Sequence, residues 1–166
     1  MALTSLSLAT HLLLAFATLL AFTDAGNASD CNTTVHNDPK VTWQTTKCCP
    51  PGPLFSKAND TLFMNYNGTF LNGTLFDSSY SPQKPWPAGD PFHFTLGAKQ
   101  VVAGFDAGLY NMCPGEIRSL KIAPEFAYGT KGTSDGAIPP NSTLAFSVEL
   151  MAIKNAAKRV RLHNRN

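Results

Sequence analysis

Apolar residues recur at every second position in several stretches of the chain, which is the spacing of a half-buried β-strand. In residues 62–66, Leu, Met and Tyr alternate with Phe and Asn. Residues 92–96 repeat the pattern with Phe, Phe and Leu, and residues 117–122 carry a shorter version. The clearest alternation covers residues 143–153. These segments predict antiparallel strands that each turn one face toward the core.

The period changes between residues 101 and 112. Apolar side chains there recur at spacings of three, four and three, which places them on one face of a short helix. They are Val102, Phe105, Leu109 and Met112. Pro114 and Gly115 are expected to end the helix. Several strands and one short helix predict an α+β fold, in which the helix covers one face of the sheet.

Turn residues separate these segments. Residues 48–53 carry three prolines and a glycine, so they cannot be helical and predict a stiff connector. Asn67-Gly68 and Asn72-Gly73 are both typical turn dipeptides. The strand faces predict a core that includes Phe94, Leu120, Val148 and Leu150.

The first 25 residues have the pattern of a signal peptide. The apolar run from Leu12 to Phe22 is shorter than the roughly 20 residues that a membrane span needs. Thr23 and Ala25 supply small residues for cleavage, although no Lys or Arg precedes the run. An uncleaved anchor is the alternative. No second apolar run is long enough to span, so we expect no stable membrane insertion.

Composition agrees with export from the cytosol. The net charge of +2 gives no reason to expect a nucleic-acid partner. Six Asn-x-Ser/Thr sequons favour glycosylation, which requires lumenal exposure. The candidates are Asn27, Asn32, Asn59, Asn67, Asn72 and Asn141. Residues 26–40 are polar and predict a flexible, glycosylatable lead-in, and residues 155–166 predict a solvated basic tail.

The four cysteines, Cys31, Cys48, Cys49 and Cys113, all follow the leader. An even number in an exported chain predicts disulfides, and spacing leaves three pairings open. A bridge between the neighbours Cys48 and Cys49 is the least favourable of them, because its geometry would be strained. Zinc is a weak alternative, since no Cys-x-x-Cys pair is present.

The order of short motifs resembles the FKBP family of prolyl isomerases. The Tyr-x-Gly strand at residues 66–68, Phe-Asp-Ser-Ser at 76–79 and Val-Val-Ala-Gly-Phe at 101–105 come first. Gly-Glu at residues 115–116, Ala-Tyr-Gly at 127–129 and Ile-Pro-Pro at 138–140 follow in the family's order.

The resemblance implies a twisted antiparallel sheet wrapped around one short helix, with the domain at residues 41–154. It implies peptidyl-prolyl cis-trans isomerase activity on proline-containing clients during the folding of secretory proteins. No metal and no cofactor are implied, macrolides are possible inhibitors, and we expect a monomer. The location implied is the lumen of the endoplasmic reticulum or the cell exterior.

The same resemblance implies an aromatic pocket for the proline. Asp77 would accept hydrogen bonds, and the Tyr128 hydroxyl would donate one to a substrate carbonyl. The pocket residues implied are Tyr66, Phe76, Asp77, Phe92, Val101, Val102, Phe105, Tyr128, Ile138 and Phe146. It also implies that Cys113 pairs with Cys49 or Cys48, and that Cys31 takes the cysteine that remains.

Three departures from the family pattern concern the pocket. Its floor is Phe105 where the family usually has Trp. Residues 81–91 are longer than usual and rich in proline, and no basic partner for Asp77 is evident. The loop at residues 129–137 lacks an aromatic residue or His at its tip. These departures leave an alternative function open, that of a catalytically weak chaperone or peptide-binding module.

Overall fold

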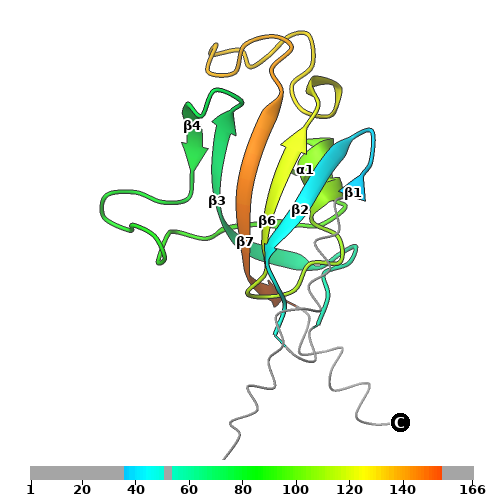
Figure 1. Cartoon of the computed structure of the whole chain (residues 1–166), viewed down its shortest axis with the longest axis vertical. Helices are drawn as coiled ribbons and strands as arrows, with labels where there is room; N and C mark the ends of the chain where they lie inside the picture. Colours follow the sequence, from blue (N-terminus) through cyan, green and yellow to red (C-terminus); the bar gives the residue numbers. More distant parts are fainter. Residues whose placement is uncertain (1–35, 51–53, 155–166) are drawn as a thin grey trace, which may run out of the picture.

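A computed structural model describes residues 36–50 and 54–154 (Figure 1). Seven strands, one α-helix and one 3₁₀ turn follow one another along these residues. They are β1 (His36–Asn37), β2 (Val41–Lys47), β3 (Thr61–Phe70), β4 (Leu75–Ser78), β5 (Phe92–Thr95), α1 (Ala103–Gly108), β6 (Ile117–Ile122), η2 (Pro124–Phe126) and β7 (Leu144–Lys154).

The strands form one antiparallel sheet in the order β1-β2-β6-β7-β3-β4, and β5 pairs with β3 beside this path. The helix α1 lies behind β6 and β2 in Figure 1. It packs closely there, because a Cβ added to Gly108 would lie 3.0 Å from the Leu120 side chain on β6. The predicted α+β class and the sheet wrapped around one helix are confirmed.

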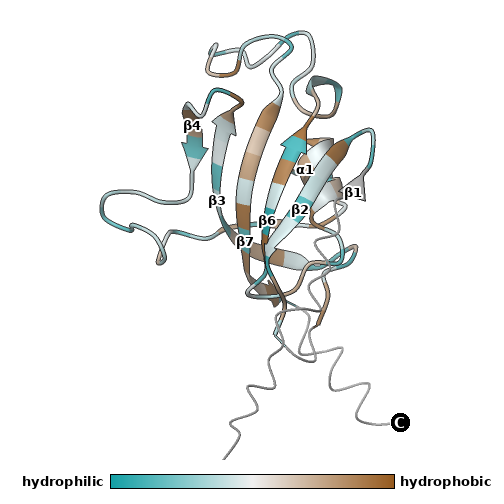
Figure 2. Ribbon diagram, in the orientation of Figure 1, coloured by the Kyte–Doolittle hydropathy of each residue, from teal (hydrophilic) through white to brown (hydrophobic). Residues whose placement is uncertain are grey.

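The core lies between the helix and the sheet. Alternation along β7 buries Leu144, Phe146, Val148 and Leu150, and Figure 2 shows this alternation as brown and pale residues along the strand. Phe94 and Leu120, predicted as core residues with Val148 and Leu150, are buried as well.

The helix is shorter than the predicted segment of residues 101–112. It ends at Gly108, because side chains elsewhere capture the next carbonyl groups. The Ser56 hydroxyl donates to the Leu109 carbonyl at 2.6 Å, and the Arg118 guanidinium donates to the Tyr110 carbonyl at 2.8 Å. Leu109 and Met112 remain fully buried, so the apolar face persists although the helical backbone does not.

One of the two predicted turns is wrong. Asn67 and Gly68 lie inside β3, where they pair with both β4 and β7. Glycine stands at position 68 because of close packing: a Cβ there would lie 2.8–2.9 Å from the rings of Phe76 and Phe146. The turn at Asn72-Gly73 is confirmed, with Gly73 at a φ of 86°.

The disulfide joins Cys49 to Cys113, one of the two pairings that the resemblance implied. Cys48 is also disulfide-bonded, and Cys31, its predicted partner, lies outside the described residues. The predicted signal peptide and basic tail lie outside them too. Ordered structure begins before position 41, since β1 pairs with β2. Within the described part of the chain, no helix has the length and apolar character to cross a membrane.

Candidate pocket between the helix and the sheet

A cavity of about 240 Å³ opens between the start of α1, the inner face of the sheet and the segment after η2. Its lining is mostly aromatic and aliphatic. The lining residues are Tyr66, Phe76, Asp77, Phe92, Gln100, Val101, Val102, Phe105, Tyr128 and Phe146. The cavity therefore gathers residues that lie far apart in the sequence, from Tyr66 to Phe146.

The floor of the pocket is made by Phe105 and Phe146. Phe105 comes from α1 and is only 4% exposed, and its ring lies 4.9 Å from that of Phe146 in an edge-on arrangement. Phe94 packs against Phe105 at 6.2 Å. Edge-on aromatic packing of this kind fixes ring orientation, so the floor is rigid and apolar.

One wall carries a hydrogen-bonded polar pair. The Tyr66 hydroxyl donates a hydrogen bond of 2.7 Å to Asp77 Oδ2. Antiparallel pairing of β3 with β4 places Gly68 opposite Asp77, which brings the two side chains into reach. Burial, followed by the hydrogen bond to Asp77, raises the pKa of Tyr66 above its usual value. Tyr66 is thus a neutral hydrogen-bond donor at physiological pH.

Tyr128 stands at the opposite rim and is 40% exposed. Burial, and then the nearby carboxylates of Asp77 and Asp135, raise the pKa of Tyr128. Its backbone is held by the turn after η2, where the Gly132 amide donates to the Tyr128 carbonyl. Among the described residues, no partner occupies the Tyr128 hydroxyl in a hydrogen bond, so it is available to a ligand.

Nearly all the predicted pocket residues meet at this cavity, and Ile138 is the one that does not. Ile138 is 5% exposed and packs in the core, where its carbonyl accepts from the Thr133 amide and so braces the loop. Gln100 also lines the cavity. The sequence did not predict it, because Gln100 is polar and belongs to none of the alternating apolar patterns. Its Oε1 accepts from the Thr95 amide at 2.6 Å, which ties β5 to the segment before α1.

Among the described residues, the salt bridges are Lys47–Glu149, Lys84–Asp90 and Arg118–Glu116, and none of them includes Asp77.

Cys49, Cys113 and Glu116 come close together, and none of the three lines the cavity. The two sulfurs form a disulfide and so offer no thiolate to a metal.

Comparisons with known proteins agree with these features. The model of the FKBP-type peptidyl-prolyl cis-trans isomerase family matches residues 52–151. FK506-binding protein 1 of Dictyostelium discoideum is 47% identical over 91 residues, which cover 55% of this chain and 78% of the relative. A peptidyl-prolyl cis-trans isomerase of Schizosaccharomyces pombe is 44% identical over 104 residues, covering 63% and 87%. The human peptidyl-prolyl cis-trans isomerase FKBP2 is 44% identical over 102 residues, covering 61% and 67%. Because the family match spans more than half of the sequence, the chain belongs to the FKBP-type peptidyl-prolyl cis-trans isomerases, the family that its motifs resemble.

Proposed function

We propose that the cavity at the start of α1 is the site where this isomerase turns the X–Pro bond of its substrates. One observation supports the proposal most directly: a single cavity combines a rigid aromatic floor with an available hydroxyl at its rim. Phe105 and Phe146 form the floor, and Tyr128 supplies the hydroxyl. A proline ring fits an apolar floor, and the flanking chain requires a hydrogen-bond donor.

The reaction needs no nucleophile. The barrier of roughly 18–20 kcal/mol arises from the amide resonance that is lost on rotation. A twisted amide has less charge separation than a planar one, so a dry aromatic site binds it better than the planar ground state. An acceleration of about 10⁵ requires about 7 kcal/mol of this differential binding.

Two polar groups have separate roles in this proposal. The Tyr128 hydroxyl donates to a substrate carbonyl, and its raised pKa keeps the proton in place at neutral pH. Asp77 accepts from the Tyr66 hydroxyl and thereby fixes the ring that forms one wall. Neither group exchanges a proton with the substrate, so we expect the rate to vary little with pH between about 6 and 8.

A protease-coupled assay with X–Pro peptides tests the proposal on the disulfide-bonded chain. Tyr128→Phe should lower kcat/KM about fivefold to tenfold, the equivalent of one hydrogen bond. Tyr110→Phe is the matched control, because it removes a hydroxyl from a tyrosine that packs on the core outside the cavity. A wild-type rate at background level, or equal losses in the two variants, would refute the assignment of the site.

A chaperone or peptide-binding role with little catalysis is the second candidate. Phe105 favours it, since a phenyl ring at the floor offers less contact than the usual indole and lacks its N–H. Binding of a client peptide with wild-type affinity, together with a silent isomerase assay, would select this role. An FK506 titration is a direct probe of the same cavity, because relatives carry the name FK506-binding protein.

We also propose that the clients are proteins of the secretory pathway, in the endoplasmic reticulum lumen or outside the cell. The leader, the sequons and the Cys49–Cys113 disulfide support this setting. Asn59, Asn72 and Asn141 are exposed and suited to carry glycans. Asn67 is less accessible, because its Oδ1 accepts from the Ser78 hydroxyl at 2.6 Å. Asn27 and Asn32 lie outside the described residues.

Glycopeptide mapping of chain expressed in eukaryotic cells tests both the setting and the choice of sites. Occupancy at Asn72 and Asn141 but not at Asn67 is the expected pattern. A chain that carries no glycan and retains its leader in the cytosolic fraction would contradict the proposed setting.

A further inference from the structure

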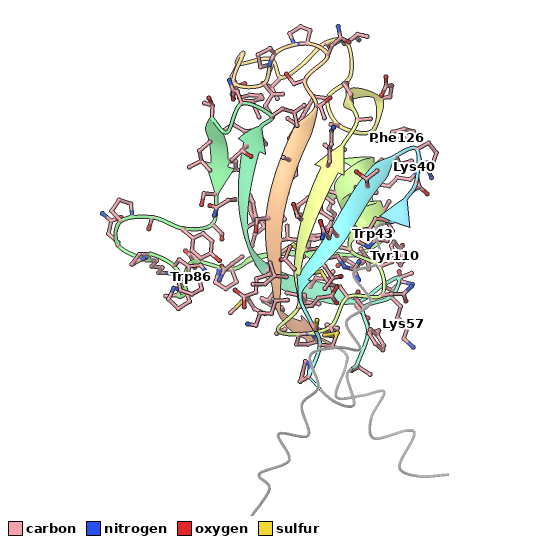
Figure 3. The ribbon with its side chains drawn as sticks, viewed as in Figure 1. Lys40, Trp43, Lys57, Trp86, Tyr110 and Phe126 are labelled. Carbon is pink, nitrogen blue, oxygen red and sulfur yellow. A yellow bond between two sulfur atoms is a disulfide. The ribbon has the colours of Figure 1, made fainter. Side chains whose placement is uncertain are left out.

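The long segment of residues 81–91 leaves the sheet beside one pocket wall and returns at another. It begins after Asp77 and its neighbours in β4 and ends at Phe92 in β5. Figure 3 shows Trp86 on this loop, beyond the β4 edge of the sheet. Trp86 is 69% exposed, and Gly89 is the single buried residue of the loop. The loop is therefore solvated over most of its length but anchored at one point.

The anchor is the side chain of Asn65 in β3, which is fully buried. Its Nδ2 donates to the Ala88 carbonyl at 3.2 Å, and its Oδ1 accepts from the Ser79 hydroxyl at 3.1 Å. A buried amide is costly unless it is paired, so these bonds hold the end of the loop against the strand.

Gly89 fits this anchor closely. Its φ of 58° lies in the left-handed region that glycine adopts readily. A Cβ at this position would lie 2.7 Å from Cγ of Asn65 and would collide with Oδ1 as well. The loop backbone therefore rests directly on the Asn65 amide.

Ser79 connects the anchor to the pocket. Its hydroxyl accepts from the Tyr66 amide at 2.8 Å, and its own amide donates to the Tyr66 carbonyl at 3.0 Å. Its carbonyl accepts from the Asp90 amide at 2.8 Å. Two residues further on, the Phe92 ring lies 6.1 Å from the Tyr66 ring in an edge-on arrangement. Phe92 is paired with Met64 of β3, and the loop enters β5 directly before it, so closure of the loop contributes to the position of the Phe92 ring.

We propose that Asn65 is a positioning residue that holds the loop of residues 81–91 closed and so sets the Phe92 rim of the pocket. Phe92 is 39% exposed, against 4% for Phe105, so it lies at the mouth and contacts the residue next to the proline rather than the proline ring. Asn65 would therefore tune the preference for the residue that flanks the proline. This inference rests on the proposed assignment of the pocket.

The test compares two variants that break the anchor from opposite sides, Asn65→Ala on the strand and Gly89→Ala on the loop. Asn67→Ala is the matched control, since it alters an amide on the same strand that bonds Ser78 and does not contact the loop. All proteins are prepared without glycans and with their disulfides. Peptides with Leu-Pro and Ala-Pro measure kinetics, and hydrogen exchange of residues 88–90 measures closure of the loop.

Both anchor variants should raise KM for the Leu-Pro peptide about fivefold, with kcat changed less than about twofold, because ground-state and transition-state contacts are lost alike. The kcat/KM ratio of Leu-Pro to Ala-Pro should fall about threefold. Hydrogen exchange should accelerate in both variants but not in the control. Because Gly89→Ala leaves the Asn65 side chain in place, agreement between the two variants separates loop closure from a general loss of stability.

Faster exchange with wild-type KM and an unchanged peptide ratio would overturn the inference, and so would unchanged exchange. Equal kinetic changes in Asn67→Ala would overturn it as well. Failure of the pocket assignment gives a different result, since Tyr128→Phe would then leave kcat/KM unaltered. The two failures are thus distinguishable.

Discussion

The two ends of α1 lie in contrasting surroundings. Near its first turn, Val102 and Phe105 line an apolar cavity that contains open aromatic surface. Near its last turn lies the buried pair of Arg118 and Glu116, which are 5% and 3% exposed. One short helix therefore separates a region built for a ligand from a region in which each polar group has a partner.

The polar region is densely hydrogen-bonded. Arg118 donates to Glu116 at 2.7 Å and to the carbonyls of Gly108, Tyr110 and Asn111, each at 2.8 Å. Its guanidinium also lies 5.5 Å from the centre of the Trp43 ring. These bonds replace the helical bonds that α1 would make if it continued, and they hold its end against β6.

Glu116 completes the same region. It accepts from the Thr45 hydroxyl and from the Cys113 amide, both at 3.0 Å. The Cys49 sulfur lies 3.5 Å from the same carboxylate, which is a packing contact, because a disulfide sulfur carries no hydrogen to donate. Hydrogen bonds therefore concentrate at one end of the helix, while the other end leaves aromatic surface and the Tyr128 hydroxyl uncovered.

Arg118→Met should have the largest effect, because it leaves Glu116 charged, buried and without its counterion. Breaking such a pair costs about 3–5 kcal/mol, which denaturant titration would measure. Lys47→Met is the control, since it removes an exposed ion pair with Glu149 at 3.5 Å and should cost less than about 1 kcal/mol. Equal losses in the two variants would remove the basis of the comparison.

Cys49→Ala with Cys113→Ala should come next. The disulfide closes a sequence separation of 64 residues, and its loss should lower the free energy of unfolding by about 2–4 kcal/mol. The kcat/KM of molecules that remain folded should change less than about threefold, because the bridge lies away from the cavity lining. A much larger loss of activity in folded protein would show that the two regions are coupled.

Phe105→Leu should lower stability only slightly but lower activity strongly, the reverse of the disulfide variant. Loss of the edge-on contact with Phe146 should cost about 1 kcal/mol of stability but lower kcat/KM about tenfold. Phe94→Leu provides the match, since Phe94 packs against Phe105 without lining the cavity. This variant should lose similar stability and keep kcat/KM within about threefold. A tenfold loss of kcat/KM in Phe94→Leu would contradict the expected difference between a cavity residue and a core residue.

The smallest effect should come from pH. Because burial raises the pKa of Tyr66 above 10.0, the unfolded chain loses this proton at a lower pH than the folded chain does. The contribution to stability is complete below pH 10 and is lost as the pH rises above it. Unfolding titrations from pH 8 to 11 should show this decline, and Tyr66→Phe should make it shallower. An unchanged slope in that variant would assign the decline to other groups.

The sequence predicted the strands and most of the cavity for a physical reason. Apolar residues at every second position show which face of a strand is buried. The order of the family motifs indicates which aromatic residues come together in the fold. Ile138 was placed in the cavity by its motif, but burial in the core depends on how a loop folds back. Motif order carries no information on that path.

Other features had no local pattern to reveal them. Arg118 shares a strand face with Leu120 and Ile122, yet nothing in the alternation shows what would satisfy a buried guanidinium there, which is the carbonyls left open at the end of α1. Asn65 reads as the polar member of an alternation, yet it is buried because the long loop packs over that face. Both are long-range consequences of packing, and the bonds of Arg118 also explain why the predicted helix was too long.

The position of β7 has a consequence for how the molecule is made. This strand lies between β6 and β3 in the sheet, yet it follows both of them in the sequence. During synthesis, β3 and β6 therefore emerge with no strand between them, and the cavity lacks Phe146 until residues 144–154 arrive. Such non-local pairing delays folding of the sheet until β7 has emerged. Until then the edges of β3 and β6 that will receive β7 are unpaired, and such edges can pair with other chains.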